Sequence, residues 1–167
     1  DLARSRGLGD VYKRQKSLEQ FRPNEITREN YERSSSVMIP LYEEDDQVHM
    51  ILTRRSKMMR HHTSEISFPG GNSEPEDTDE WSTAKREAYE EINLDPALPK
   101  KIGTLESFIT VGSKSFVTPV VATLDGRPEL KANPYEVEKI LHVPLTELLL
   151  PEVCLLYTSP SPRDLAR

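Results

Sequence analysis

The chain has 167 residues, which is enough for one domain with a single hydrophobic core. It is 35% hydrophobic and 30% charged, and no apolar run approaches the length needed to cross a membrane. The formal net charge of −6 disfavours a surface built for nucleic acid, so we expect no nucleic-acid or membrane partner, while a small-molecule ligand stays allowed. A phosphate-bearing ligand stays compatible, because a bound cation reverses the local charge.

The two ends of the chain are related to each other at the level of DNA. A back-translation of Cys154–Asp164, read on the complementary strand in a shifted frame, encodes Ser5–Arg14. The ends of a natural protein have no reason to be reverse complements, and the DNA resembles a transposase sequencing adapter. We interpret residues 1–15 and 154–167 as adapter-derived tails, and residues 16–153 as one domain that is cut at both ends.

Removing the tails changes two of the bulk properties. The tails carry a net charge of +3, so the remaining domain carries −9. The single cysteine, Cys154, lies in the second tail, so no disulfide or thiol chemistry is expected.

Short strands dominate the first part of the domain. Thr27–Arg33 is expected to form a short helix capped by its first residue. Ser36–Tyr42 and Val48–Thr53 have the composition of half-buried strands, and the acidic stretch Glu43–Gln47 between them predicts a turn. A hairpin is the simplest interpretation.

A basic segment, Arg54–His62, then interrupts the apolar pattern. One interpretation is a solvated loop on an acidic protein, and the other is an anion clamp. The planar guanidinium fork of arginine grips phosphate oxygens in pairs, which makes Arg54, Arg55 and Arg60 candidates to bind a phosphate-bearing substrate. The two histidines in this segment are adjacent and point in different directions, so we expect no zinc site there.

The next stretch leads through a glycine pair into the longest expected helix. Ile66–Phe68 predicts a short strand ending at a tight turn, where Gly70 and Gly71 would let a backbone carbonyl approach a ligand. A helix is expected from about Asp79 to Ile92, capped by an Asp or Thr among residues 77–79. Its apolar stripe, which should pack on a sheet, comprises Trp81, Ala84, Ala88 and Ile92.

Three carboxylates share one face of that helix. Glu87, Glu90 and Glu91 lie at positions i, i+3 and i+4, where like charges repel by about 0.2–0.5 kcal/mol per pair in water. A solvated acidic face is one explanation, and a hard divalent cation with oxygen ligands is the other. The metal site is favoured by the upstream glycine pair and by Arg86, which can orient a neighbouring carboxylate through paired hydrogen bonds.

Further strands are expected after the helix. Lys101–Phe108 and Val117–Thr123 predict two strands, and the loop Ile109–Ser115 between them is expected to border a cleft. Asn133–Val137 precedes a short strand at Ile140–Val143.

The segment Arg86–Leu94 resembles the C-terminal half of the Nudix box, in which an Arg-Glu pair, an apolar residue and a Glu-Glu pair recur. Gly71 and Asp77, with five residues between them, resemble the first half. Asp77 stands where most members have Glu, eight rather than seven residues separate it from Arg86, and Asn93 replaces the usual Gly. The last change is mild, because Asn is well suited to a left-handed helix C-cap.

The resemblance extends to one branch of that family. Leu52–Ser56, Arg60, Phe68–Gly71 and the longer spacing within the box are similar to the coenzyme A pyrophosphatases. Two positions depart from that pattern, because Ser64 and Glu65 stand where Gly and Gln are usual.

The resemblance implies a fold and a set of roles. The fold would be α/β (α+β), a mixed β-sheet sandwiched between helices, with the chain ending before the C-terminal helix. Mg²⁺ or Mn²⁺ would be bound by Glu87, Glu90, Glu91 and a carbonyl of Gly70 or Gly71, while Arg86 holds Glu87. Glu136 matches a distal carboxylate of the metal site, and either it or Glu87 would be the base. The substrate contacts would be Arg54, Arg55, Arg60 and Phe68.

The activity implied is hydrolysis of the diphosphate of coenzyme A or acyl-coenzyme A to 3′,5′-ADP and 4′-phosphopantetheine. One alternative keeps the enzyme and changes the substrate to another nucleoside diphosphate derivative, such as a dinucleotide or a nucleotide sugar. The other is a catalytically inert binding domain or fragment. An intracellular location (cytoplasm, mitochondrion or peroxisome) is expected, and the sequence leaves compartment and oligomeric state open.

Overall fold

A computed structural model describes residues 34–56, 65–110 and 115–148. The expected helix at Thr27–Arg33, the candidate Arg60, both adjacent histidines, Ser64 and the two tails lie outside these ranges. Within them, the structure is a strand-rich domain with one long helix, α2 (Glu80–Ile92), and one short helix, α3 (Leu145–Leu148).

The predicted hairpin is confirmed. Strands β1 (Ser34–Glu44) and β2 (Gln47–Arg55) pair antiparallel, and only Asp45 and Asp46 separate them. Both turn residues have positive φ, 52° and 59°, which a two-residue hairpin turn requires and which a short polar side chain tolerates. Both strands run longer than the sequence predicted, because the polar residues at their ends also pair with neighbouring strands.

Strand β1 is the centre of the sheet. Along one edge it pairs in parallel with β7 (Phe116–Leu124), which in turn pairs antiparallel with β5 (Lys100–Thr104) and β6 (Phe108–Ile109). Its other edge is divided: Ser35–Val37 pair with β4 (Gly70–Asn72), and Leu41–Glu44 pair with β2. At Thr53 and Arg54, β2 pairs with β3 (Ile66–Ser67). From His49 to Arg55 it also pairs with β8 (Val137–Pro144).

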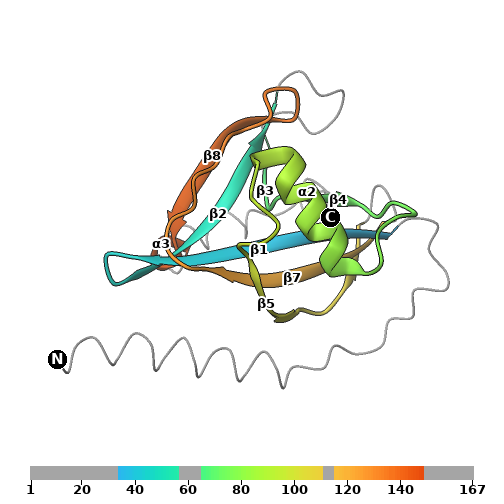
Figure 1. The fold of residues 1–167 in the computed structure, drawn as a ribbon, viewed down its shortest axis with the longest axis horizontal. Coiled ribbons are helices and arrows are strands. Elements are labelled where there is room, and N and C mark those ends of the chain that lie inside the picture. Colours follow the sequence, from blue (N-terminus) through green and yellow to red (C-terminus); the bar gives the residue numbers. More distant parts are fainter. Residues whose placement is uncertain (1–33, 57–64, 111–114, 149–167) are drawn as a thin grey trace, which may run out of the picture.

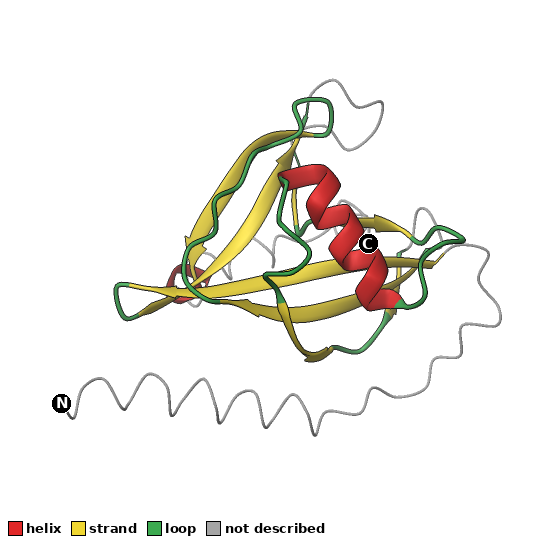
Figure 2. Ribbon diagram, in the orientation of Figure 1, coloured by secondary structure: helices red, strands yellow, loops and turns green. Residues whose placement is uncertain are grey.

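Helix α2 lies in the angle that this divergence opens. In Figure 1 the β1–β7 pair and the β2–β8 pair run in different directions, and α2 lies between them. Figure 2 shows the same arrangement as one long helix against a strand layer. The mixed sheet and the α/β class expected from the sequence are confirmed.

The hydrophobic core forms between α2 and the sheet face toward it. Three members of the predicted stripe, Ala84, Ala88 and Ile92, are fully buried there, and the small alanines let the helix lie close to the strands. Trp81 is partly buried at the edge of the core, with Lys85 Nζ 5.3 Å from its ring centre. The sheet contributes Met38, Tyr42, Ile51, Val120, Ala122, Leu124 and Val137.

Two local predictions need correction. Gly70 and Gly71 do not form a tight turn; they are extended and form strand β4 beside β1. The expected strand at Lys101–Phe108 is interrupted: β5 ends at Thr104, and β6 begins at Phe108. A register shift between Lys101 and Gly103 in the pairing with β7 precedes this break.

One face of the sheet has no second long helix in the described ranges. Val37, Ile39 and Leu41 alternate with the core residues of β1 and are half-buried on the side opposite to Met38. No helix of the described residues is long and apolar enough to cross a membrane.

Candidate active site

Both ends of α2 are fixed by local interactions. Asp79 is the N-cap: its Oδ1 accepts from Ser82 N at 2.7 Å, and the Ser82 hydroxyl accepts from Asp79 N at 3.0 Å, as in a capping box. Asn93 ends the helix in the left-handed conformation, φ 55°, and its N–H donates to Tyr89 O. The cap predicted among residues 77–79 and the predicted Asn C-cap are thus confirmed.

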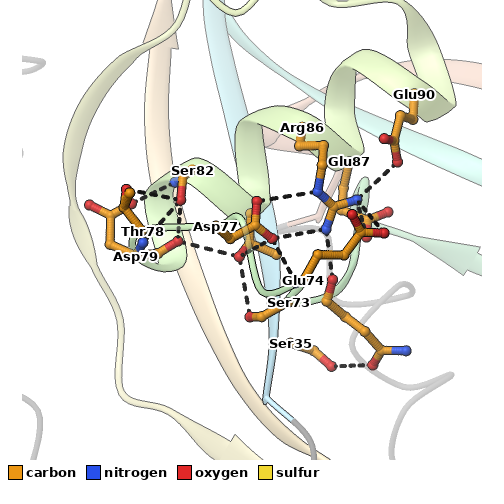
Figure 3. A network of polar contacts seen from close by, with 12 residues as sticks. Ser35, Ser73, Glu74, Asp77, Thr78, Asp79, Ser82, Arg86, Glu87 and Glu90 are labelled. Atoms are coloured by element: carbon orange, nitrogen blue, oxygen red, sulfur yellow. Dashed lines mark hydrogen bonds and ion pairs between the residues drawn. The ribbon is translucent and has the colours of Figure 1, made fainter.

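Arg86 is the hub of the polar network on α2 (Figure 3). Its Nε and Nη2 donate to the two carboxylate oxygens of Asp77 at 3.3 and 3.0 Å, and Nη2 also donates to Asn72 O at 2.7 Å. Its Nη1 donates to Glu87 Oε1 and to Glu90 Oε2, each at 3.0 Å. The guanidinium therefore positions two of the three predicted carboxylates while Asp77 holds it from the other side.

The three helix carboxylates occupy different environments. Glu91 is only 5% exposed, and its Oε2 accepts from Gly70 N at 3.3 Å. Burial raises the pKa of Glu91 to about 7, helped by the charges of Glu87 and Glu136 and opposed by Gly70 N–H and by Arg55. Burial also raises the pKa of Glu87, against the lowering effect of Arg86. Glu90 is the most open of the three, with 46% of its side chain exposed.

Strand β4 requires glycine because the backbone runs against its neighbours. A Cβ on Gly71 would lie 2.5 Å from the carboxylate of Glu87, and a Cβ on Gly70 would lie 2.4 Å from Ser36 O. The glycine pair therefore lets the sheet approach the carboxylates of α2. The predicted approach of a Gly70 or Gly71 carbonyl to a ligand stays a prediction.

Glu136 reaches the same region from the other side of the fold. Asn133 N donates to Glu91 O at the end of α2, and the N–H groups of Glu136 and Val137 donate back to Asn133 O. The backbone of Glu136 also accepts from Ser56 N at 2.8 Å, next to the end of β2. The charge of Glu136 raises the pKa of both Glu87 and Glu91, so it acts on two of the three helix carboxylates.

The predicted substrate-binding residues are not all in one place. Arg55 lies close enough to Glu91 to lower that carboxyl's pKa. Arg54 Nη2 instead bonds Glu138 Oε1 of β8 at 3.1 Å, with 40% of the arginine side chain exposed. Phe68 is half-buried between β3 and β4, and Arg60 lies outside the described residues. Their roles in substrate binding stay predictions.

The chemistry of the donor set fits a divalent cation. The acidic side chains of this region, Glu87, Glu90 and Glu91, offer carboxylate oxygens, which suit Mg²⁺ or Mn²⁺ better than a softer metal. The buried, mutually repelling carboxylates Glu87 and Glu91 would be stabilised by a positive ion. Among the described residues, no three His, Cys, Asp or Glu side chains are already gathered at ligand distance, and Glu90 is bonded to Arg86. Binding a cation would therefore require side-chain movement.

Sequence reasoning missed several residues that build the site. Asp77 was noted only as part of a motif, yet it is the main partner of Arg86. Thr83 and Asn133, which hold Asp77 and the Glu136 turn, carry no sequence signal of their own. The Asn-Pro pair at 133–134 predicts a turn, but nothing in it indicates contact with α2.

The fold and the site together define an α/β protein in which several glutamates of one helix lie against a mixed sheet. The NUDIX domain family matches residues 32–157. The chain therefore belongs to the Nudix family, which confirms the resemblance noted in its sequence. Members of this family generally use divalent metal ions.

Curated relatives extend this family assignment. The chain is similar to the peroxisomal coenzyme A diphosphatase NUDT7 of Mus musculus, with 36% identity over 71% of this chain and 50% of that protein. It is also similar to the mitochondrial Nudix hydrolase 15 of Arabidopsis thaliana, with 41% identity over 71% of this chain and 42% of that protein. The chain spans about half the length of these relatives.

Solved structures show the same fold at low identity. An Ap4A hydrolase of C. elegans superposes with a TM-score of 0.58 and 19% identity, covering 75% of this chain and 93% of that one. The Nudix domain of Shewanella oneidensis NrtR, solved with ADP ribose, gives a TM-score of 0.55 and 17% identity, covering 80% and 84%. At such identities the likeness concerns the fold alone.

Proposed function

We propose that this protein hydrolyses the diphosphate bond of coenzyme A or an acyl-coenzyme A, giving 3′,5′-ADP and a 4′-phosphopantetheine. The observation that carries the hydrolytic chemistry is the pair Glu87 and Glu91: burial raises the pKa of both, that of Glu91 to about 7, and Glu136 adds to the effect on each. Perturbed carboxylates of this kind are a mark of functional sites. The coenzyme A substrate is supported by the similarity to the mouse coenzyme A diphosphatase.

The cation would be held by Glu87, Glu90 and Glu91, with a carbonyl of Gly70 or Gly71 completing its oxygen shell. When bound, Mg²⁺ or Mn²⁺ neutralises the diphosphate and polarises it toward attack by water. Arg86 keeps Glu87 and Glu90 on one side of α2 through its Nη1. Arg55 supplies positive charge beside Glu91 and is our candidate for a substrate phosphate, with Arg54, Arg60 and Phe68 as further contacts.

The proton of the attacking water goes to Glu87 or to Glu136. Glu87 accepts from Arg86, which favours its charged form, whereas burial works against it. Glu136 is held by Asn133 Nδ2 at 3.4 Å and is partly exposed. General-base catalysis contributes about 10²- to 10⁴-fold, so the two glutamine variants separate these roles. The true base is the residue whose replacement removes the acidic limb of the pH–rate profile.

The experiment that tests the function is phosphate-ester product analysis with coenzyme A and Mg²⁺ or Mn²⁺. We expect 3′,5′-ADP from the wild-type chain and a loss of at least about 100-fold in Glu91→Gln, which removes one charged ligand but keeps an acceptor for Gly70 N. Turnover of ADP ribose or a diadenosine polyphosphate equal to that of coenzyme A would defeat the substrate assignment. An unchanged rate in Glu91→Gln would defeat the metal site.

We further propose an intracellular location, which coenzyme A as a substrate requires. The relatives' names support this, since one is peroxisomal and another mitochondrial. Fractionation of cells expressing the complete protein would test the location.

A further inference from the structure

The carboxylate of Asp77 is unusually well supplied with donors. Its side chain is 7% exposed, and its Oδ2 accepts from Glu74 N at 2.9 Å, Thr83 Oγ1 at 2.9 Å and Arg86 Nη2 at 3.0 Å. Its Oδ1 accepts from Arg86 Nε. These bonds, led by those from Arg86, hold the pKa of Asp77 below its usual value. One carboxylate thus joins the 73–79 loop, the first turns of α2 and the arginine that orients the site.

Thr83 is the donor in this set that the proposed chemistry does not yet use. It is fully buried on α2, one turn before Glu87. A helical threonine commonly returns its hydroxyl to the carbonyl four residues earlier, and Asp79 O lies 3.3 Å from Oγ1. The contact to Asp77 is shorter, and Ser73 Oγ lies 3.2 Å away on the loop side. A hydroxyl has one proton, and the shortest contact, to a charged acceptor, takes it.

We propose that Thr83 is a positioning residue: it fixes Asp77, and through Asp77 the guanidinium of Arg86 that holds Glu87 and Glu90. Without the Thr83 hydroxyl, the nearly buried Oδ2 would face an apolar group and lose one of its three donors. The carboxylate then turns toward water, and the guanidinium fork that grips both of its oxygens turns with it. Because Arg86 Nη1 contacts both Glu87 and Glu90, this movement displaces two proposed metal ligands together.

The consequence for turnover rests on the proposed function, whereas the consequence for side-chain geometry does not. The test therefore compares Thr83→Val, which keeps the shape and removes the donor, with Thr83→Ser, which keeps the donor. Ser82→Ala is the matched control, because it weakens the neighbouring helix cap without touching Asp77. Each chain is measured for Mn²⁺ binding by electron paramagnetic resonance, coenzyme A hydrolysis and thermal unfolding.

We expect Thr83→Val to weaken Mn²⁺ binding by about three- to tenfold, the net effect of about one ordinary hydrogen bond, because the lost bond acts on the ligands only through Asp77 and Arg86. Thr83→Ser should stay within about twofold of wild type. Ser82→Ala should lower the melting temperature yet bind Mn²⁺ normally. A purely structural role for Thr83 would instead lower stability in both Thr83 variants and leave Mn²⁺ affinity unchanged, and that result overturns the proposal.

A metal-free readout keeps the two proposals separable. The Nε–H resonance of Arg86 should be sharp and shifted by its bond to Asp77 in wild type and in Thr83→Ser, and broadened in Thr83→Val. If wild type neither binds Mn²⁺ nor hydrolyses coenzyme A, the proposed function fails while this signal still decides the role of Thr83. An Arg86 resonance that is identical in Thr83→Val and wild type overturns that role, whatever the enzyme does.

Discussion

The two ends of the diverging sheet differ in how their polar and charged groups are partnered. At the α2 end, the pKa values of Glu87 and Glu91 are raised by burial and by neighbouring glutamates, although Arg86 lowers the first and Arg55 the second. At the hairpin end, by contrast, groups are matched in pairs, through Tyr42, His49, His142 and the Glu44–Arg127 ion pair. Tyr42 Oη lies 2.8 Å from His142 Nδ1, its ring stacks on His49 at 5.2 Å, and Arg127 Nη1 lies 3.2 Å from Glu44 Oε2.

The hairpin end therefore contributes to the stability of the fold, whereas the α2 end lowers it. Buried like charges at the α2 end destabilise the folded chain, a cost that the proposed cation would relieve, whereas the paired groups at the hairpin end need no ligand. This difference can be tested by changing one group at each end and measuring activity and stability separately.

The largest effect is expected from closing the space between β4 and α2. In Gly71→Ala the new Cβ would meet the Glu87 carboxylate at 2.5 Å, so that side chain must move away from Arg86. We expect kcat/KM to fall by at least about tenfold, because misplacement of a metal ligand by about an ångström is costly.

Gly126→Ala is the control for this change. Its Cβ would meet nothing within 4 Å, but φ is +83°, so it should cost about 1–2 kcal/mol of stability and leave activity intact. Equal losses of activity in the two alanine variants would contradict the assigned role of Gly71.

The second effect is a gain in stability on removing a proposed ligand. The folded-state pKa of Glu91, about 7, lies above its unfolded value, so the wild-type chain loses stability as the pH rises from about 4.5 through 7. Metal-free Glu91→Gln should therefore be more stable than wild type by about 1–3 kcal/mol at pH 8.5, and by much less at pH 4.

Denaturant unfolding at the two pH values measures this difference. Saturating Mg²⁺ should narrow the gap, because the cation stabilises only the chain that binds it. A Glu91→Gln chain that is less stable than wild type at pH 8.5 would show that the buried carboxylate is not the source of strain.

The smallest effect is expected at the hairpin end, where stability rises with pH and does not fall. Burial, with help from Arg127 and His49 and against Glu44, lowers the pKa of His142 below its ordinary value of about 6.5. The unfolded chain then binds the proton more tightly, so this contribution to stability is present above about pH 6.5 and is lost as the pH falls.

His142→Gln should flatten that part of the stability profile by less than about 1 kcal/mol, because the ring is partly exposed. Unfolding of both chains between pH 5 and 7.5 provides the measurement, with the activity at pH 8 as a check that the site is intact. If the stability of His142→Gln depends on pH as that of wild type does over this range, His142 is not the source of this pH dependence.

Local sequence patterns predicted the elements that depend on neighbouring residues. The hairpin, the Asp79 cap, the Asn93 C-cap and the stripe of Ala84, Ala88 and Ile92 all follow from side chains within one or two turns of each other. Patterns failed where backbone pairing with a distant strand decided the outcome. The glycine pair became strand β4 because β1 offered it an edge, and the expected strand Lys101–Phe108 is divided into two strands that each pair with β7.

The sequence by itself determined the family motif, the class of the fold and the ridge of Glu87, Glu90 and Glu91, since helical spacing alone places those side chains together. Only the tertiary structure decided how the three differ. Glu91 is buried against β4 and accepts from Gly70 N, and Asn133 N bonds the end of α2 to the turn that carries Glu136. The bond from Arg86 to Glu90, one helical turn away, is by contrast local. The burial that raises the pKa of Glu91 and the hydrogen bonds of β4 and Asn133 depend on segments that are distant in the chain.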